Sequence, residues 1–133
     1  MIDAATRRPV RERAGDRCEY CRLHQNQSEL LHHIEHVVAR RHGGTDHVDN
    51  LALACHRCNL HKRPNLSGVD PFTAVIVSLF NPRDGRWKEH FAFRQEFIEG
   101  LTPTGRATVE VLALNDARRL ALRRELWALC ELN

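Results

Sequence analysis

The chain has 133 residues, of which 42% are hydrophobic and 28% are charged, with a formal net charge of +3. These values are ordinary for a soluble globular protein, and they predict a single domain over residues 1–133. No apolar run approaches the roughly 18 residues that a membrane-spanning helix requires. The basic N-terminus lacks the apolar stretch of a signal peptide, so we expect a cytoplasmic protein whose cysteines stay reduced.

The basic residues are strongly biased towards arginine, which supplies 18 of the 20, leaving only Lys62 and Lys88 as lysines. The planar guanidinium group binds phosphate through two parallel hydrogen bonds, whereas lysine offers a point charge. The bias is therefore consistent with a phosphate-containing partner, and equally with the base composition of the genome.

The first half of the chain predicts short elements separated by loops. In order, the pattern of apolar residues, glycine and proline gives a helix over 6–17, a loop over 22–28, a strand over 29–34, a loop over 43–50, a strand or buried turn over 51–54 and a helix over 56–63. The last helix is expected to end at Pro64, because proline lacks the N–H that would continue it.

The second half predicts a hairpin followed by helices. In order, it gives a turn-rich connector over 64–71, paired strands over 74–80 and 87–93 with a turn at 81–86, a third strand over 97–101, and helices over 104–114 and 116–131. The fold class is thus α+β. We expect a core over about 14–64 and a C-terminal extension, made of the β-hairpin and the helices, over 65–133.

Two Cys-x2-Cys pairs, Cys18/Cys21 and Cys55/Cys58, are separated by 33 residues. Four thiolates in two such pairs can enclose one tetrahedral Zn²⁺. In a reducing compartment this spacing favours a structural zinc site over the two alternatives, a pair of disulfides or four unrelated buried thiols. The fifth cysteine, Cys130, is expected to take no part and to lie on the apolar side of the last helix.

Eight of the nine histidines lie between His24 and His61, within or beside the segment that the cysteine pairs bracket. An enzyme that hydrolyses phosphodiesters needs a base to activate water and a cation to stabilise the leaving oxygen. Histidine suits the first role because its unperturbed pKa is about 6.5. Carboxylate and amide oxygens suit Mg²⁺ or Mn²⁺. Any one of these histidines taken alone is more often a packing or surface residue.

Three stretches, CEYC, EHVVARRHGGTDHVDNL and CHRCNLHK, resemble the HNH endonuclease family in its zinc-knotted ββα-metal form. In that family a Gly-Gly pair begins seven residues after the catalytic histidine, which here selects His36 rather than His33. An Asn-Leu pair and the residue after the last cysteine complete the motif. Asn50 and Asn59 occupy these positions, so the chain resembles an H-N-N variant of the family.

The resemblance implies a role for each matched residue. His36 would be the general base that activates water, and Glu35 and Asn59 would bind the catalytic Mg²⁺ or Mn²⁺ that holds the scissile phosphate. Asn50 would brace the loop and orient His36. Glu35, Ala39 and Asn59 depart from the residues that are commoner in the family, but none of them removes a required chemical type. The structural zinc would be held by Cys18, Cys21, Cys55 and Cys58.

Contacts to DNA are expected from basic residues beside the predicted catalytic strand and on the last helix of the motif, namely Arg40, Arg41, Arg57, Lys62 and Arg63. Phosphate contacts of this kind make binding dependent on salt and carry no sequence information. The alternative is a solvated basic face. A further arginine cluster either extends this surface or keeps the last helix soluble, and it consists of Arg118, Arg119, Arg123 and Arg124.

Together, the residues and the resemblance predict a metal-dependent endonuclease that hydrolyses phosphodiester bonds in DNA, with DNA as its partner and no membrane. The first rival interpretation is a non-catalytic, zinc-ribbon-like module that binds nucleic acid. The second is a protein-interaction domain in which zinc is only a scaffold. Neither rival needs the full set of Glu35, His36, Asn50 and Asn59. Two-strand cleavage by one small site would favour a homodimer.

Overall fold

The first half of the chain folds around one antiparallel hairpin. In the computed structural model, which describes residues 2–129, β1 (His33–His36) pairs with the whole of β2 (Leu51–Ala54). β1 therefore begins four residues later than the predicted strand. The physical reason is that β2 offers only four residues for pairing. The two leucines that suggested an earlier start, Leu30 and Leu31, are 54% and 67% exposed.

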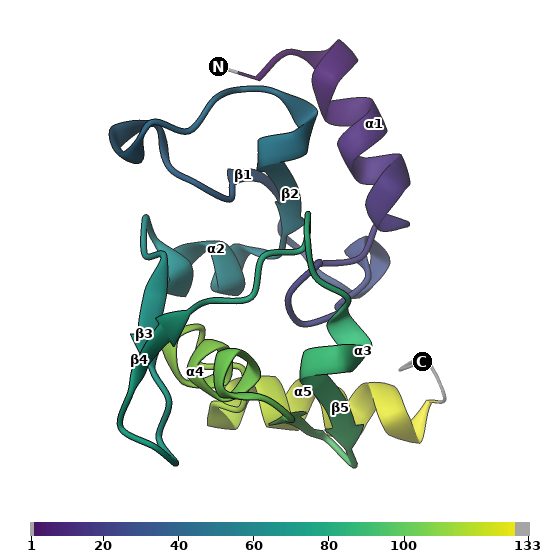
Figure 1. Ribbon diagram of the computed structural model, residues 1–133. Helices are drawn as coiled ribbons and strands as arrows, with labels where there is room; N and C mark the ends of the chain where they lie inside the picture. Colours follow the sequence, from purple (N-terminus) through teal and green to yellow (C-terminus); the bar gives the residue numbers. More distant parts are fainter. Residues whose placement is uncertain (1, 130–133) are drawn as a thin grey trace. The chain divides into compact units, whose positions relative to one another are not determined.

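Helix α1 (Ala4–Ala14) covers one face of this hairpin (Figure 1). Val10 is fully buried and belongs to one apolar cluster with Leu51 and Leu53 of β2. The helix confirms the one predicted over residues 6–17, but it ends earlier. Gly15 follows it in the left-handed conformation with φ of 63°, a region that glycine enters at little cost.

Helix α2 (His56–Lys62) follows β2 directly and contacts both strands of the hairpin. Successive side chains of a strand point to opposite faces, so His33 and Glu35 share one face of β1. Their contacts show that this is the face towards α2, since His33 bonds His56 and Glu35 pairs with Lys62. The predicted helix over 56–63 is confirmed, and the segment over 51–54 is a strand rather than a buried turn.

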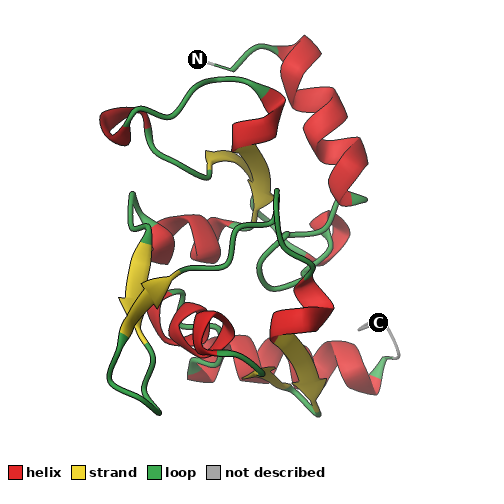
Figure 2. Ribbon diagram, viewed as in Figure 1, coloured by secondary structure: helices red, strands yellow, loops and turns green. Residues whose placement is uncertain are grey.

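The connection between β1 and β2 is long and irregular and contains two short helical turns, η2 (Arg40–His42) and η3 (Val48–Asn50) (Figure 2). A third turn, η1 (Gln25–Gln27), precedes β1. Gly44 packs so tightly that a Cβ atom there would lie 1.7 Å from the carbonyl oxygen of Val38. Only glycine fits this position, which explains one of the two glycines in the predicted loop.

The second half begins with a hairpin that the sequence analysis did not predict. β3 (Ser67–Val69) pairs with β4 (Ile76–Ser78), although β3 lies in the segment predicted to be a connector. The Asp70 carboxylate closes the turn by accepting hydrogen bonds from the backbone N–H of Phe72 and from the Thr73 hydroxyl. Helix α4 (Pro103–Val111) packs against both strands.

The pairing predicted between strands 74–80 and 87–93 is wrong. The second of these segments starts as a short helix, α3 (Trp87–His90), and continues as β5 (Phe91–Arg94). β5 pairs with β6 (Phe97–Gly100), which confirms the predicted third strand. The intervening turn is hard to predict from sequence because glutamine, at position 95, adopts a φ of 54° where glycine or asparagine is usual.

Helix α5 (Ala117–Ala128) contains two buried arginines of the C-terminal cluster. Arg119 donates hydrogen bonds to the carbonyl oxygens of Leu112 and Ala113 at the end of α4. Arg123 donates to the carbonyl oxygen of Glu96. These two side chains therefore satisfy backbone acceptors inside the fold, and they are not part of a surface that could contact DNA.

The described residues group into two compact units. The first contains the chain up to Leu66 together with Asn81–Trp87, and the second contains Ser67–Phe80 and the described residues from Lys88 onwards. The mixture of helices and strands confirms the α+β class. The single-domain organisation, with a core that ends near residue 64, stays a prediction. No helix within residues 2–129 is long and apolar enough to cross a membrane. Cys130 lies outside the described residues.

The pairing of Asp70 with Arg106 predicts a pH dependence for the stability of the second unit. The two side chains meet in a bidentate arrangement, with Nε–Oδ1 and Nη2–Oδ2 distances of 2.8 and 2.9 Å. Arg106 holds the pKa of the Asp70 carboxyl well below its usual range. Because the folded pKa is lower than the unfolded one, this stabilisation is present above about pH 4 and is lost as the pH falls further.

We therefore expect Asp70→Asn to lower the Tm relative to wild type at pH 7, and the difference to shrink at pH 3. Circular dichroism melts of both proteins in the same buffers measure it. Asp84→Asn, at an exposed aspartate, is the control and should leave Tm nearly unchanged at both pH values. A Tm difference for Asp70→Asn that stays constant with pH would contradict this account.

Candidate functional site

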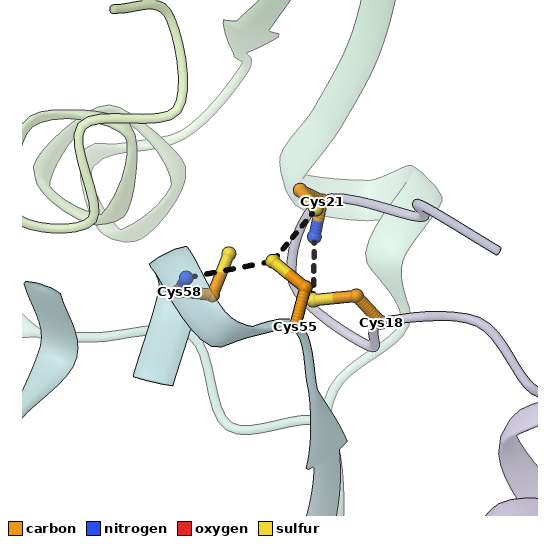
Figure 3. Close-up of side chains that lie close together, drawn as sticks. All are labelled: Cys18, Cys21, Cys55 and Cys58. Carbon is orange, nitrogen blue, oxygen red and sulfur yellow. Dashed lines mark hydrogen bonds between the residues drawn. The ribbon is translucent and has the colours of Figure 1, made fainter. Parts of the chain in front are cut away.

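The four cysteines of the two Cys-x2-Cys pairs are all buried and meet at one point. Their Sγ atoms lie within 4.8 Å of one another, and the Sγ atoms of Cys21 and Cys55 are 3.6 Å apart. Figure 3 shows the four side chains turned towards a common centre. All four are free thiols, so the two predicted alternatives of disulfides and unrelated buried thiols do not describe this arrangement.

The local backbone presents each pair of sulfurs in the same way. The N–H of Cys21 donates to the Sγ of Cys18, and the N–H of Cys58 donates to the Sγ of Cys55, both at 3.5 Å. The second of these bonds also caps the N-terminus of α2. Sulfurs bound to one tetrahedral zinc at about 2.3 Å lie roughly 3.8 Å apart. The cluster therefore fits a zinc ion in both donor type and spacing.

Burial disfavours the thiolate form of two of the four cysteines. It raises the pKa of the Cys18 and Cys58 thiols well above their usual value, because thiolate charges would be far from water. A bound zinc ion reverses this preference, since the metal binds the thiolate form. The charge of the metal would thus compensate for the burial of its own ligands.

Asn50 is the last residue of the β1–β2 connection, and its side chain holds two earlier parts of that connection in place. Its side-chain amide donates to the carbonyl oxygens of Val38, at 2.9 Å, and Thr45, at 2.8 Å. Its Oδ1 accepts the N–H of Val38 at 2.9 Å. These three hydrogen bonds, made by one side chain, hold the segment that leaves β1 next to the segment that returns to β2.

His36 is the last residue of β1, and its side chain meets an aspartate of the same connection. Its Nε2 lies 2.8 Å from Oδ1 of Asp46. Arg40 binds the same carboxylate through Nε, at 3.0 Å, and NH2, at 2.5 Å. The hydrogen bond from His36, followed by those from Arg40, lowers the pKa of the Asp46 carboxyl. Arg40, predicted to contact DNA, is therefore engaged with Asp46.

Glu35 points to the opposite side of the strand, into the interior. Its Oε1 lies 3.0 Å from the Lys62 ammonium group and accepts a hydrogen bond from the Tyr20 hydroxyl at 3.1 Å. Its other oxygen, Oε2, is buried without a hydrogen-bond partner among the described residues. Burial is the main influence on this carboxyl and raises its pKa, while Lys62 acts in the opposite direction.

Lys62 is not the surface contact that the sequence suggested. The residue is 2% exposed, and its ammonium group also donates to the carbonyl oxygen of Val37 at 3.1 Å. The long apolar part of the side chain lets Lys62 extend from α2 to the hairpin, where Glu35 compensates the buried charge. Lys62 therefore joins α2 to β1 and cannot contact a DNA phosphate in this conformation.

The predicted site residues fall into two groups. Glu35, on the helix-facing side of the hairpin, pairs with Lys62 of α2, and Asn59 lies on α2 three residues before Lys62. His36 belongs to the second group, with Asp46 and the loop. Among residues 2–129, no hydrogen bond joins His36 to Glu35 or Asn59. The remaining predicted DNA contacts are Arg41 and Arg63, which are exposed, and Arg57, which is half-buried.

Three other histidines have partners inside the fold. His33 and His56 form a hydrogen bond between Nε2 and Nδ1 at 3.1 Å. His32 is 1% exposed, and its Nε2 bonds the carbonyl oxygen of Leu23 at 2.9 Å. These contacts are those of packing residues.

The arrangement consists of a four-sulfur cluster, a histidine at the end of a strand, an asparagine that braces the following loop, and a second asparagine directly after the last cysteine. Residues 18–64 match the HNH endonuclease family. The HNH segment thus includes all four cysteines, Glu35, His36, Asn50 and Asn59. Comparisons with curated proteins and with solved structures found no match to this chain.

Sequence reasoning missed Asp46, the only carboxylate that forms a hydrogen bond with His36 among the described residues. The signal was weak, because Asp46 follows the Gly-Gly turn by two residues and reads as a loop aspartate. Only the fold of the connection brings it back to the end of β1. The same holds for the Glu35–Lys62 pair, whose partners are 27 positions apart in the chain.

The cysteine cluster predicts one zinc ion per chain, and removing one thiol should release it. We expect Cys55→Ser to lose zinc and to unfold the first unit, because structural zinc supplies roughly 10–16 kcal/mol of apparent binding free energy in small modules. Elemental analysis and circular dichroism of the purified variant measure both effects. Cys130→Ser is the matched control and should retain zinc. A Cys55→Ser protein that keeps both its zinc and its fold would rule out this site.

Proposed function

We propose that the protein is a metal-dependent endonuclease that hydrolyses phosphodiester bonds in DNA. The observation that carries this proposal is the match of residues 18–64 to the HNH endonuclease family. From their spacing in the sequence, we assign His36, Asn50 and Asn59 to the three positions that name the family. HNH proteins are generally nucleases, which supports nuclease-type chemistry. The substrate, the residue roles and the ββα-metal description of the β1–β2–α2 segment are part of the proposal.

Glu35 and Asn59 carry the type of donor atom that a catalytic Mg²⁺ or Mn²⁺ would need. The Oε2 atom of Glu35 is buried and has no hydrogen-bond partner in the described chain, so it is available as a ligand. The side chain of Asn59 makes no hydrogen bond within residues 2–129 and is only half-buried. Both supply the oxygen donors that these cations prefer. When bound, the metal would neutralise charge that develops on the phosphate and the leaving oxygen.

The remaining chemistry belongs to this chain's own side chains. The imidazole of His36 accepts a proton from water as the water oxygen forms a bond to phosphorus. The phosphorus bond to the leaving oxygen breaks, and that oxygen takes a proton from solvent. Asn50 keeps the end of β1 and the following loop in register during this step. Arg41, Arg57 and Arg63 would bind the DNA backbone, which makes affinity depend on salt.

A second candidate is the non-catalytic module that binds nucleic acid. It is favoured by the pairing of Glu35 with Lys62, which already compensates the carboxylate without a metal ion. The absence of a hydrogen bond between His36 and Glu35 or Asn59 in the described chain points the same way. The unpartnered Oε2 of Glu35 favours the nuclease, since a purely structural ion pair would satisfy both oxygens.

Loss of His36 should separate these two functions. We expect the wild-type protein to nick supercoiled plasmid with Mg²⁺ or Mn²⁺, and His36→Ala to reduce the rate about 10²–10⁴-fold, the usual contribution of a general base. His42→Ala is the matched control, because His42 is exposed on the same loop. If both the wild type and His36→Ala bind DNA without cutting it, across several metals and substrates, the binding module is the correct function.

The metal ligands can be tested at Asn59. Asn59→Ala should keep the zinc and the fold but lose cleavage and weaken Mn²⁺ binding, measured by calorimetry on the zinc-loaded protein. Asn65→Ala, at an exposed asparagine beyond α2, serves as the control. Glu35→Ala is a poorer test, because it leaves the buried Lys62 without its opposite charge at a cost of about 3–5 kcal/mol. Unchanged Mn²⁺ affinity in Asn59→Ala would contradict this ligand assignment.

A further inference from the structure

The contact between His36 and Asp46 determines which imidazole nitrogen is available for chemistry. Asp46 is 48% exposed at its side chain, and its carboxyl has a lowered pKa, so it is ionised at neutral pH. An ionised carboxylate only accepts hydrogen bonds. The proton of a neutral His36 must therefore sit on Nε2, 2.8 Å from Oδ1 of Asp46. The lone pair then remains on Nδ1.

Arg40 keeps the aspartate in place. Its guanidinium group contacts both carboxylate oxygens, in the bidentate arrangement that best fixes the plane of a carboxylate. The Oδ1 atom receives one of these bonds as well as the bond from His36. Arg40, Asp46 and His36 thus form a linear chain of contacts that ends at the imidazole.

Asn50 connects this chain to the backbone of the loop. Thr45, whose carbonyl oxygen accepts a bond from Asn50, is the residue immediately before Asp46. The other two bonds of Asn50 hold Val38, two residues after His36. Gly44 lets the loop close here, since a Cβ would lie 2.8 Å from the Asn50 side-chain nitrogen. One asparagine therefore fixes the backbone beside both members of the His36–Asp46 pair.

We propose that Asp46 is a positioning residue that holds His36 in the tautomer with Nδ1 unprotonated, and that Asn50 acts on His36 through Asp46. The catalytic consequence rests on the proposed function, because Nδ1 is then the atom that accepts the proton of water. The tautomer itself does not rest on it. Arg40 holds Asp46 in place, and its removal is expected to change turnover rather than DNA affinity.

The tautomer can be read directly by nitrogen NMR of zinc-loaded protein labelled at histidine, at about pH 8, where an ordinary imidazole is neutral. His36→Ala assigns the signal. We expect wild type to show a protonated Nε2 and an unprotonated Nδ1 at His36. Asp46→Ala should give a mixture of the two tautomers, and Asp46→Asn should restore the wild-type form because its amide oxygen still accepts the bond. Identical His36 spectra in wild type and Asp46→Ala would overturn the proposal.

Kinetics test the catalytic consequence with the same variants. We expect Asp46→Ala to lower kcat on the order of ten- to a hundredfold with little change in KM, as for a misplaced reacting group, and Asp46→Asn to recover most of it. Arg40→Ala should also act on kcat. Its matched control, Arg41→Ala, should act on KM and on the salt dependence of binding.

The outcomes separate this proposal from the proposed function. A wild-type protein that does not cut DNA, but whose His36 tautomer depends on Asp46, refutes the nuclease and supports the positioning contact. If cleavage of DNA depends on His36 but kcat is the same in wild type and Asp46→Ala, the positioning role is refuted and the proposed nuclease function stands. An effect of Arg40→Ala confined to KM would show that Arg40 contacts DNA, as predicted from the sequence, and does not position Asp46.

Discussion

The convergence of four thiols from two distant parts of the chain is the constraint on which the first unit depends. Cys18 and Cys21 come from the loop after α1, Cys55 lies between β2 and α2, and Cys58 lies in α2. Burial disfavours the thiolates of Cys18 and Cys58, so a bound metal would compensate a charge that the fold otherwise avoids. By fixing where α2 begins, the same cluster also fixes Asn59, the residue after its last sulfur.

The hairpin above this cluster separates the site residues by face. Glu35 turns towards α2, where Lys62 and Tyr20 bind one of its oxygens and leave the other without a partner. The next residue, His36, turns towards the loop and meets Asp46. One strand therefore presents a candidate metal ligand to the helix and a candidate base to the loop. Alternation along a β-strand is the physical reason that neighbours in sequence have such different surroundings.

Spacing in the sequence predicts the cysteine cluster and the HNH segment, because short motifs place their own residues. It also predicts α1, α2 and the last helices, whose signals are local. It fails for the hairpin at residues 67–78, which depends on the Asp70 side chain. It also fails for the partners of Glu35 and His36. Lys62 and Asp46 reach them only through the packing of α2 and the folding of the loop, which no local pattern encodes.

The central claim is that this protein hydrolyses a phosphodiester bond with water activated at His36. Cleavage of a defined DNA duplex in ¹⁸O-labelled water, followed by mass spectrometry of the product ends, tests it most directly. The account predicts one labelled oxygen in each new terminal phosphate and no such product from His36→Ala. Products without the label, or equal labelled product from His36→Ala, would contradict it.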